Sequence, residues 1–177
     1  MELLNALNRY TPVNPQEARD RQQFLTLLQS GQELYTRENP VAHLTASSWV
    51  VSPDRKQVLL VYHNIYNSWS WIGGHADGDR DLCGVALRET GEESGLMDLR
   101  LLTPEIFSLE TLTVDGHIKR GSYVSSHLHL NVTYLLEADP SAQVHVKPDE
   151  NSGVQWVPID HILAYAIESE WHPGYQR

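Results

Sequence analysis

The sequence predicts a single α/β domain, because segments with strand patterns alternate along the chain with a segment of helical spacing. Apolar and β-branched residues dominate 42–51 and 57–63, which predicts two strands. Apolar and polar residues alternate from 125 to 138, which predicts another. Residues 82–94 carry apolar side chains at helical spacing. A length of 177 residues fits one domain with a full hydrophobic core.

The first 40 residues predict a helical extension that precedes the main domain at 41–177. Pro12 and Pro15 separate two apolar stripes of helical spacing, so we expect two helices joined by a turn. The stripes consist of Leu3, Leu4, Leu7, Phe24, Leu25, Leu27 and Leu28. The extension is compatible with a packing arm, with a contact in a homodimer, or with a lid over a substrate.

A hairpin and an aromatic loop follow. The run Ser52-Pro53-Asp54-Arg55 is a turn signal between the first two strands. The polar aromatic segment 62–69 comes after the second strand. Its side chains either stack on a flat group of a ligand or belong to the core, and the two interpretations have equal weight. His63 and Trp69 are therefore candidate substrate-binding residues.

The next segment places carboxylates on a helix. Gly73 and Gly74 follow a short aromatic strand, aspartates then stand where a helix N-cap belongs, and Gly95 stands where a C-cap belongs. Near the end of this helix come Glu89, Glu92 and Glu93. At about 100° of rotation per residue they share one side, which continues the apolar stripe of the same helix.

Clustered and partly desolvated carboxylates favour their neutral forms, and the helix dipole disfavours negative charge at this end. A cation is therefore expected beside them. Oxygen ligands suit a hard divalent ion, Mg²⁺ before Ca²⁺ or Mn²⁺. The alternative is a solvated face of a surface helix. The flanking glycines favour the metal site.

The second half of the chain adds strands and histidines. Residues 99–112 predict a strand interrupted by Pro104, and 114–117 predict a turn. His127 and His129 lie on the polar face of the alternating run. That face either lines a substrate cleft or meets solvent. The two histidines are also compatible with zinc, but no third ligand stands nearby in the sequence.

A polar loop at 148–153 precedes a short strand at 154–158, and a helix is expected at 160–168 with Ile162, Leu163 and Ile167 inward. Glu150 is the first candidate in this loop for a further metal-binding or general-base carboxylate, and Asp149 is the second. The other interpretation is a polar turn without a role.

Composition limits the classes of partner. The formal net charge is −10 and no block of Lys and Arg occurs, which argues against binding long nucleic acid. No apolar run approaches the ~20 residues that span a bilayer, and no signal-peptide pattern is present, so we expect a cytoplasmic protein. Cys83 is the single cysteine, and a small buried apolar role is favoured over that of a nucleophile.

Taken together, residues 74–96 resemble the Nudix box, which reads Gly, five residues, Glu, seven residues, Arg-Glu-aliphatic-X-Glu-Glu-X-Gly-aliphatic. Gly74 supplies the first glycine, and the segment from Arg88 to Leu96 supplies the second half in register. Thr90 takes the aliphatic position and Arg80 replaces the first glutamate. The resemblance implies an α/β/α sandwich with a mixed central sheet.

The resemblance also implies roles for individual residues. The family's metal ligands match Glu89, Glu92 and Glu93, with the carbonyl of Gly73 as a further candidate. Glu92, Glu93 or Glu150 would accept the proton of the attacking water. Arg88 would orient a glutamate. In the family the first glutamate helps to organise this arginine and the metal shell, so Arg80 bears on the number of metal ions, and a nearby aspartate is a candidate substitute.

The implied activity is Mg²⁺-dependent hydrolysis, with Mn²⁺ as a possible substitute, of a nucleoside diphosphate linked to another moiety. ADP-ribose and a nucleoside triphosphate are leading examples of such a small phosphorylated substrate. A binding or regulatory module that has lost turnover is the alternative, and Arg80 is its support. Isopentenyl diphosphate isomerase is disfavoured because that enzyme needs a cysteine upstream of the box, where this chain has none.

Overall fold

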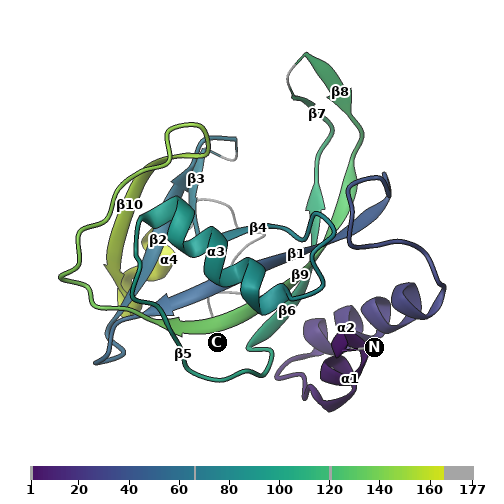
Figure 1. Cartoon of the computed structure of the whole chain (residues 1–177), viewed down its shortest axis with the longest axis horizontal. Coiled ribbons are helices and arrows are strands. Elements are labelled where there is room, and N and C mark those ends of the chain that lie inside the picture. The colour runs from purple at the N-terminus through teal and green to yellow at the C-terminus, as the bar shows by residue number, and fades with distance from the viewer. Residues whose placement is uncertain (1, 66, 120, 166–177) are drawn as a thin grey trace.

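The computed structural model describes residues 2–65, 67–119 and 121–165 (Figure 1). Within these residues, a mixed sheet of eight strands forms the centre, in the order β10-β2-β1-β9-β5, with β3 on β2, β4 on β1 and β6 on β9. The strands are β1 (Ala42–Val51), β2 (Gln57–His63), β3 (Ser68–Ser70), β4 (Ile72–His75), β5 (Arg100–Leu101), β6 (Ser108–Val114), β9 (His127–Glu137) and β10 (Asn151–Pro158).

The predicted hairpin is present, but its two strands diverge. β1 and β2 pair antiparallel at Val51 and Val58, beside the turn. Further along, β4 pairs with β1 from Thr45 to Ser48, whereas β3 pairs with the end of β2. On its other side, β1 runs parallel to β9 along its whole length. β1 is therefore the central strand of the sheet, because it pairs with β2, β4 and β9.

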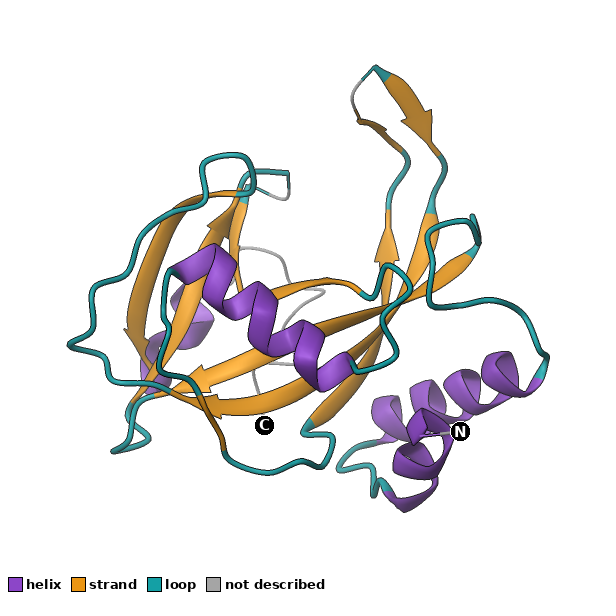
Figure 2. Ribbon diagram, viewed as in Figure 1, coloured by secondary structure: helices purple, strands orange, loops and turns teal. Residues whose placement is uncertain are grey.

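Helices cover both faces of the sheet (Figure 2). α3 (Leu82–Ser94) packs on one face, where Val85 and Ala86 share a buried cluster with Leu44 and Leu130. On the other face, Ile162 packs with Val58, Leu60 and Val157. Ile162 begins the short helix α4 (Ile162–Tyr165), which follows the 3₁₀ turn η1 (Ile159–His161). This is the predicted α/β/α sandwich with a mixed sheet.

The two predicted N-terminal helices are α1 (Glu2–Arg9) and α2 (Pro15–Gln29). Asn14 caps α2, because its side chain accepts a hydrogen bond of 2.9 Å from the backbone N–H of Glu17. Leu7 and Phe24 are fully buried in the same cluster as Leu109 of β6. The helices thus share the core of the sheet, beside β6 (Figure 1).

Three local predictions differ from the structure. Residues 115–116 form no turn, because β6 continues into a separate hairpin of β7 (His117–Lys119) and β8 (Ser122–Val124). The single strand predicted at 99–112 is two strands, β5 and β6, which pair with different parts of β9.

The last predicted helix also differs. It starts as a 3₁₀ turn, and Leu163, which was expected to face inward, is 49% exposed, whereas Ile162 is 3% exposed. Ile167 lies outside the described residues. Among the helices described, none has the length and apolar character needed to cross a membrane.

Candidate active site

The candidate site lies at the C-terminal half of α3. The helix starts at its N-cap Asp81, whose side chain accepts a 3.0 Å hydrogen bond from the N–H of Gly84. It ends at Gly95, which has a φ of 78° and donates its N–H to the carbonyl of Gly91. This left-handed C-cap is the conformation that glycine adopts without steric cost. Both predicted ends of the helix are therefore confirmed.

Carboxylates from two separate segments converge beside this helix. Glu89, Glu93 and Glu150 each offer a carboxylate oxygen, and these oxygens all lie within 4.8 Å of one another. Glu89 and Glu93 are one helical turn apart, and Glu150 comes from the loop before β10. Glu93 is 3% exposed, while the other two are half-buried. An all-oxygen donor set of this kind suits a hard divalent cation.

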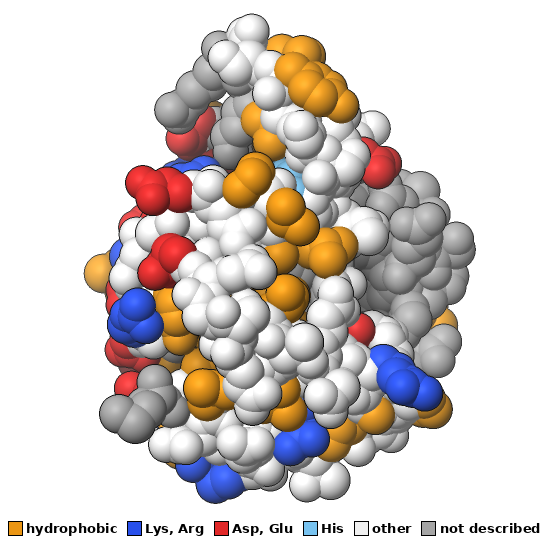
Figure 3. Space-filling model, turned by 90° about the vertical axis from the view of Figure 1, so that its right-hand side faces the viewer, with side chains coloured by type: hydrophobic (Ala, Val, Ile, Leu, Met, Phe, Trp, Pro, Cys, Tyr) orange, Lys and Arg blue, Asp and Glu red, His pale blue; other side chains and the backbone are white. Residues whose placement is uncertain are grey.

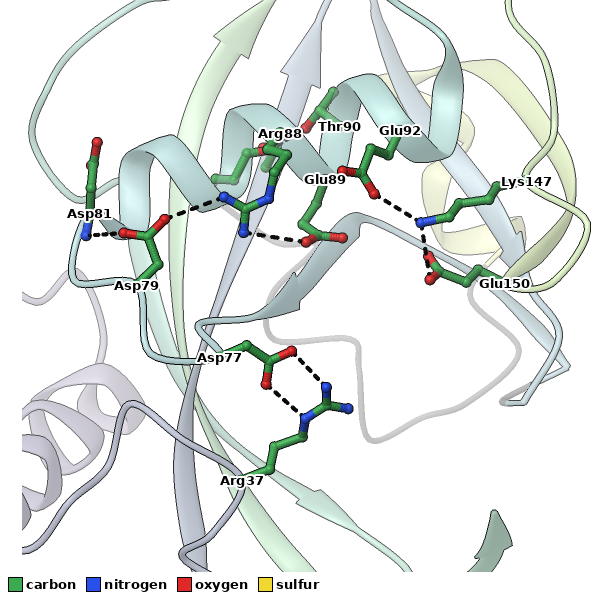
Figure 4. Close-up of polar contacts among 12 residues, drawn as sticks. Arg37, Asp77, Asp79, Asp81, Arg88, Glu89, Thr90, Glu92, Lys147 and Glu150 are labelled. Atoms are coloured by element: carbon green, nitrogen blue, oxygen red, sulfur yellow. Dashed lines mark hydrogen bonds and ion pairs between the residues drawn. The ribbon is translucent and has the colours of Figure 1, made fainter. Parts of the chain in front are cut away.

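Glu92 lies at the edge of this cluster, outside that group of three. It is exposed, and its Oε2 lies 3.0 Å from Nζ of Lys147 (Figure 4). The same Nζ lies 3.1 Å from Oε1 of Glu150. Glu89 and Glu93 are four residues apart and therefore lie on the same face of the helix. Glu92 is rotated by about 100° from Glu93, so the three glutamates do not all point to one side, contrary to the prediction. Lys147 thus bridges Glu92 to the group.

The loop that carries Glu150 is held by two neighbouring segments. Asn151 is fully buried, and its Nδ2 donates to the backbone carbonyl of Glu93 over 3.0 Å. Its Oδ1 accepts from the N–H of Lys147 over 3.2 Å. The backbone N–H of Asn64, after β2, donates to the carbonyl of Glu150 over 3.0 Å. These bonds fix the position of Glu150 relative to α3.

The electrostatics of the cluster favour a proton or a cation. Burial raises the pKa of Glu93 to about 8, and the neighbouring charges of Glu150 and Glu89 add to this effect. Burial also raises the pKa of Glu89, and the charge of Glu92 contributes. In the protein without a metal ion, neutral Glu93 is therefore the main form at neutral pH. A bound divalent ion would reverse this by stabilising the carboxylate.

Arg88 lies beside two carboxylates, although Arg80 replaces the first glutamate of the box. Arg88 Nη1 lies 3.3 Å from Oδ2 of Asp79, and its Nη2 lies 3.7 Å from Oε1 of Glu89 (Figure 4). Asp79 thus supplies a carboxylate to Arg88 from the loop before the helix. Arg80 itself is exposed, lies 3.8 Å from Glu33, and stacks over the ring of Tyr35.

Gly74 allows α3 to approach β4 closely. A Cβ placed on Gly74 would lie 2.5 Å from Cδ of Glu89, inside any normal contact distance. A Cβ on Gly73 would lie 2.6 Å from that of Ser47 on β1. The glycines thus bring β4 next to both β1 and the carboxylate of Glu89. Gly73 lies in β4 directly before Gly74.

The four predicted substrate-binding residues fall into two places. His63 ends β2, pairs with Asn151 in the sheet, and accepts at Nδ1 the N–H of Ile65. Trp69 makes edge contacts with Tyr62 and Tyr165, with ring centroids 5.5 Å and 6.0 Å apart. These two residues lie near the loop of Glu150.

His127 and His129 lie on β9 and contact other histidines. The ring centroid of His43 lies 4.9 Å from each of them, and that of His75 lies 4.8 Å from that of His129. Farther along the same strand, Asn131 and Thr133 are buried and bond to polar side chains of β1 and β6.

Four residues beside these clusters were not predicted: Lys147, Asn151, His43 and His75. Lys147 and Asn151 flank Glu150 closely, so a charged or amide side chain beside the candidate acid was an available signal. His43 and His75 had no such signal, because they meet His129 only through the pairing of β1 with β9 and with β4. Cys83 lies half-buried on α3 against the core, and burial raises the pKa of its thiol.

Comparisons with known proteins agree with this architecture. The family model described as NUDIX domain matches residues 42–175. A C. elegans Ap4A hydrolase in a binary complex shares 19% identity over 75% of this chain and 92% of that chain, with a TM-score of 0.55. The E. coli dihydroneopterin triphosphate pyrophosphohydrolase shares 14% identity over 81% and 96%, with a TM-score of 0.56.

A MutT protein from Methanosarcina mazei Go1 shares 15% identity over 75% of this chain and 88% of its own, with a TM-score of 0.56. At such identities the likeness concerns the fold. A search among curated proteins found no match. The family model spans most of the chain, and the chain therefore belongs to the Nudix family.

Proposed function

We propose that the chain is a Mg²⁺-dependent hydrolase that cleaves the pyrophosphate bond of a nucleoside diphosphate linked to another moiety. The observation that carries this proposal is the convergence of Glu89, Glu93 and Glu150, whose oxygens lie within 4.8 Å of one another. Their crowding and burial create a site that a divalent cation would stabilise.

Glu89, Glu93 and Glu150 would hold the ion, and the carbonyl of Gly73 and the carboxylate of Glu92 are further candidate ligands. The donor set fits Mg²⁺, with Mn²⁺ as a substitute, because every donor is an oxygen. When bound, such an ion neutralises phosphate charge and lowers the pKa of a water molecule.

The chain's own residues then position and deprotonate the attacking water. Glu150 is half-buried and is held by its contacts with Asn64 and Lys147, which makes it a positioned proton acceptor. Glu92 and Glu93 are the other candidates for this base. Arg88 contacts both Asp79 and Glu89, so its role is to orient the Glu89 carboxylate.

The family and the carboxylates of the site support the proposed substrate class. The similar structures include proteins named for Ap4A and for dihydroneopterin triphosphate, which both contain phosphoanhydride bonds. Trp69 and His63 lie near the Glu150 loop and are the candidates for contact with a base or sugar. His127 and His129 are candidates farther along the sheet. A cytoplasmic location and a homodimer remain expectations.

The test is hydrolysis of a panel of nucleoside triphosphates, ADP-ribose, NADH and dinucleoside polyphosphates with Mg²⁺. We expect turnover of at least one, and a loss of about 10²- to 10⁴-fold in kcat for Glu93→Gln and Glu150→Gln. Asp98→Asn, an exposed change outside the site, is the matched control. No turnover of any member, with metal binding unchanged in Glu93→Gln, would favour the module that has lost activity.

A further inference from the structure

A second group of potential metal ligands lies on the sheet, away from the carboxylates. His43 comes from β1, His75 from β4, and His127 and His129 from β9. One ring nitrogen from each of His43, His75 and His129 falls within 4.8 Å of the others. The four rings surround one another, with neighbouring centroids 4.8 to 5.2 Å apart.

Strand register explains this convergence and separates it from the carboxylate site. His43 and His129 are direct partners in the parallel pair of β1 and β9. His75 is the partner of Thr45, two residues from His43 and so on the same face. Gly74 precedes His75 and faces Glu89 of α3. Because successive residues of a strand face opposite ways, the histidines lie on the face of the sheet opposite to α3.

One pair of ring nitrogens lies at a separation that also fits metal coordination. Nε2 of His127 lies 3.2 Å from Nε2 of His129, and the two nitrogens share a hydrogen bond when no metal ion is bound. Two nitrogens bound tetrahedrally to zinc at about 2.0–2.1 Å are about 3.3 Å apart. The other separations, up to 4.8 Å, close to this value by small rotations of half-buried rings.

The protonation pattern of His43 and His127 leaves a lone pair on Nε2 of each ring, and Nε2 of His129 donates to that of His127 until a metal ion displaces its proton. Nδ1 of His43 lies 3.3 Å from the carbonyl of Asn39, and Nδ1 of His127 lies 2.8 Å from that of Ser125. A carbonyl accepts only, so Nδ1 carries the proton in both rings and Nε2 holds a lone pair. A backbone carbonyl on the second nitrogen is the usual support of a metal-binding histidine.

His43 supplies the independent observation. Its side chain is 5% exposed, and within the described part of the chain its Nε2 is a buried atom with no hydrogen-bond partner. Such an atom costs free energy unless a ligand satisfies it. The positive charge of nearby Arg37 is neutralised by a bidentate pair with Asp77, at 2.6 and 2.7 Å (Figure 4).

We propose that His43, His75 and His129 bind a divalent transition-metal ion, Zn²⁺ in first place, with His127 in reach as the fourth ligand. Imidazole nitrogen selects Zn²⁺, Cu²⁺ or Ni²⁺ over Mg²⁺, so this site and the carboxylate site would bind different ions. The ion would clamp β1, β4 and β9 together. It has a route from solvent, because His75, His127 and His129 are half-buried. Figure 3 shows a small histidine surface, in pale blue, below the hydrophobic side chains at the top of the molecule.

The test compares Zn²⁺ and Mg²⁺ binding in variants of the two sites. It uses isothermal titration calorimetry on protein that carries no histidine tag. ZnCl₂ is titrated into the wild type and into His75→Asn, His129→Asn, His161→Asn and Glu93→Gln. We expect each of the first two variants to weaken Zn²⁺ binding by at least about 10-fold. His161→Asn, an exposed histidine outside the cluster, and Glu93→Gln should bind Zn²⁺ like the wild type. Mg²⁺ binding should fail only in Glu93→Gln.

Visible absorption of the Co²⁺-substituted protein is the second measurement, because tetrahedral nitrogen coordination gives intense d–d bands and octahedral oxygen coordination gives weak ones. Intense bands that vanish in His129→Asn would support the proposal. Zn²⁺ affinity unchanged in both His75→Asn and His129→Asn, or lost in Glu93→Gln, would overturn it. Circular dichroism of each variant establishes that a loss of binding is not a loss of folding.

Discussion

Glu93 couples the pH dependence of stability to the metal site. In the metal-free protein its pKa is about 8, against an ordinary value of 4.5. Between these values the folded protein holds a proton that the unfolded chain releases, so the free energy of unfolding falls as pH rises. The loss is complete once pH exceeds the folded-state pKa. We expect Glu93→Gln to flatten this decline, as measured by urea unfolding with a chelator from about pH 5 to about pH 9.

The same proton competes with Mg²⁺, so the apparent affinity of the wild type for Mg²⁺ should increase as pH rises toward 8. Parallel decline of stability in the wild type and in Glu93→Gln would show that Glu93 is not the group responsible.

Gly74 and Gly91 provide a contrast within one site. A Cβ on Gly74 would collide with the side chain of Glu89 at 2.5 Å, whereas one on Gly91 would meet only a backbone oxygen of Leu96 at 3.4 Å. We expect Gly74→Ala to displace Glu89 and to weaken Mg²⁺ binding and turnover together. Gly91→Ala should keep both and stabilise α3 by up to about 1 kcal/mol. Mg²⁺ calorimetry and thermal unfolding measure the pair, and equal Mg²⁺ affinity in the two variants would contradict this assignment.

The loop of Glu150 and the end of α3 are joined by one buried side chain. Removal of the Asn151 amide would leave the carbonyl of Glu93 and the N–H of Lys147 without their partner. Each unsatisfied buried group costs about 1–3 kcal/mol, so Asn151→Ala should lower the free energy of unfolding by an amount in this range or above it. It should also lower kcat by loosening Glu150. Asn151→Asp retains the acceptor for Lys147 and loses the donor to Glu93.

Urea unfolding and steady-state kinetics on the two Asn151 variants measure both effects. Wild-type kcat in Asn151→Ala would show that Glu150 is held without this bond.

Helices and strands that are marked by turn or capping residues in the sequence could be predicted. Strands that form only because they pair with a neighbouring strand could not. The bounds of β1 and β2 follow from a turn signal between two apolar runs, and α3 follows from its caps. Among the described residues, β7 and β8 pair only with each other. Their hairpin carries exposed apolar residues, Ile118 and Tyr123, so its sequence shows no alternation of buried and exposed positions.

The same distinction applies to the two candidate sites. The carboxylates of α3 lie close in sequence, so helical spacing was enough to group them. The cluster of His43, His75 and His129 depends on strand order and register in a mixed sheet, which pattern alone does not determine. Glu150 lies between these cases, because the family resemblance indicated its loop and only the structure brings it to Glu89 and Glu93.

The whole molecule is held by a core that extends from the sheet into the N-terminal helices. Leu7 and Phe24 lie in the same cluster as Leu44 and Leu109, and residues of α2 pack against β6. A packing role for the extension, as opposed to a detached arm, predicts that its core residues govern the stability of the entire domain.

Phe24→Ala tests this role. Its side chain is 0% exposed, and truncation of a buried phenylalanine costs about 3–5 kcal/mol through lost transfer free energy and the cavity left behind. We expect urea unfolding to show one transition, with a free energy of unfolding lower than that of the wild type by this amount. Tryptophan fluorescence, which reports on the sheet, and far-UV circular dichroism, which reports on the helices, should give the same result. Val13→Ala, at a side chain that is 66% exposed, is the control and should change the free energy of unfolding little. Two separate transitions, with the fluorescence midpoint unchanged in Phe24→Ala, would instead identify residues 1–40 as an independent unit.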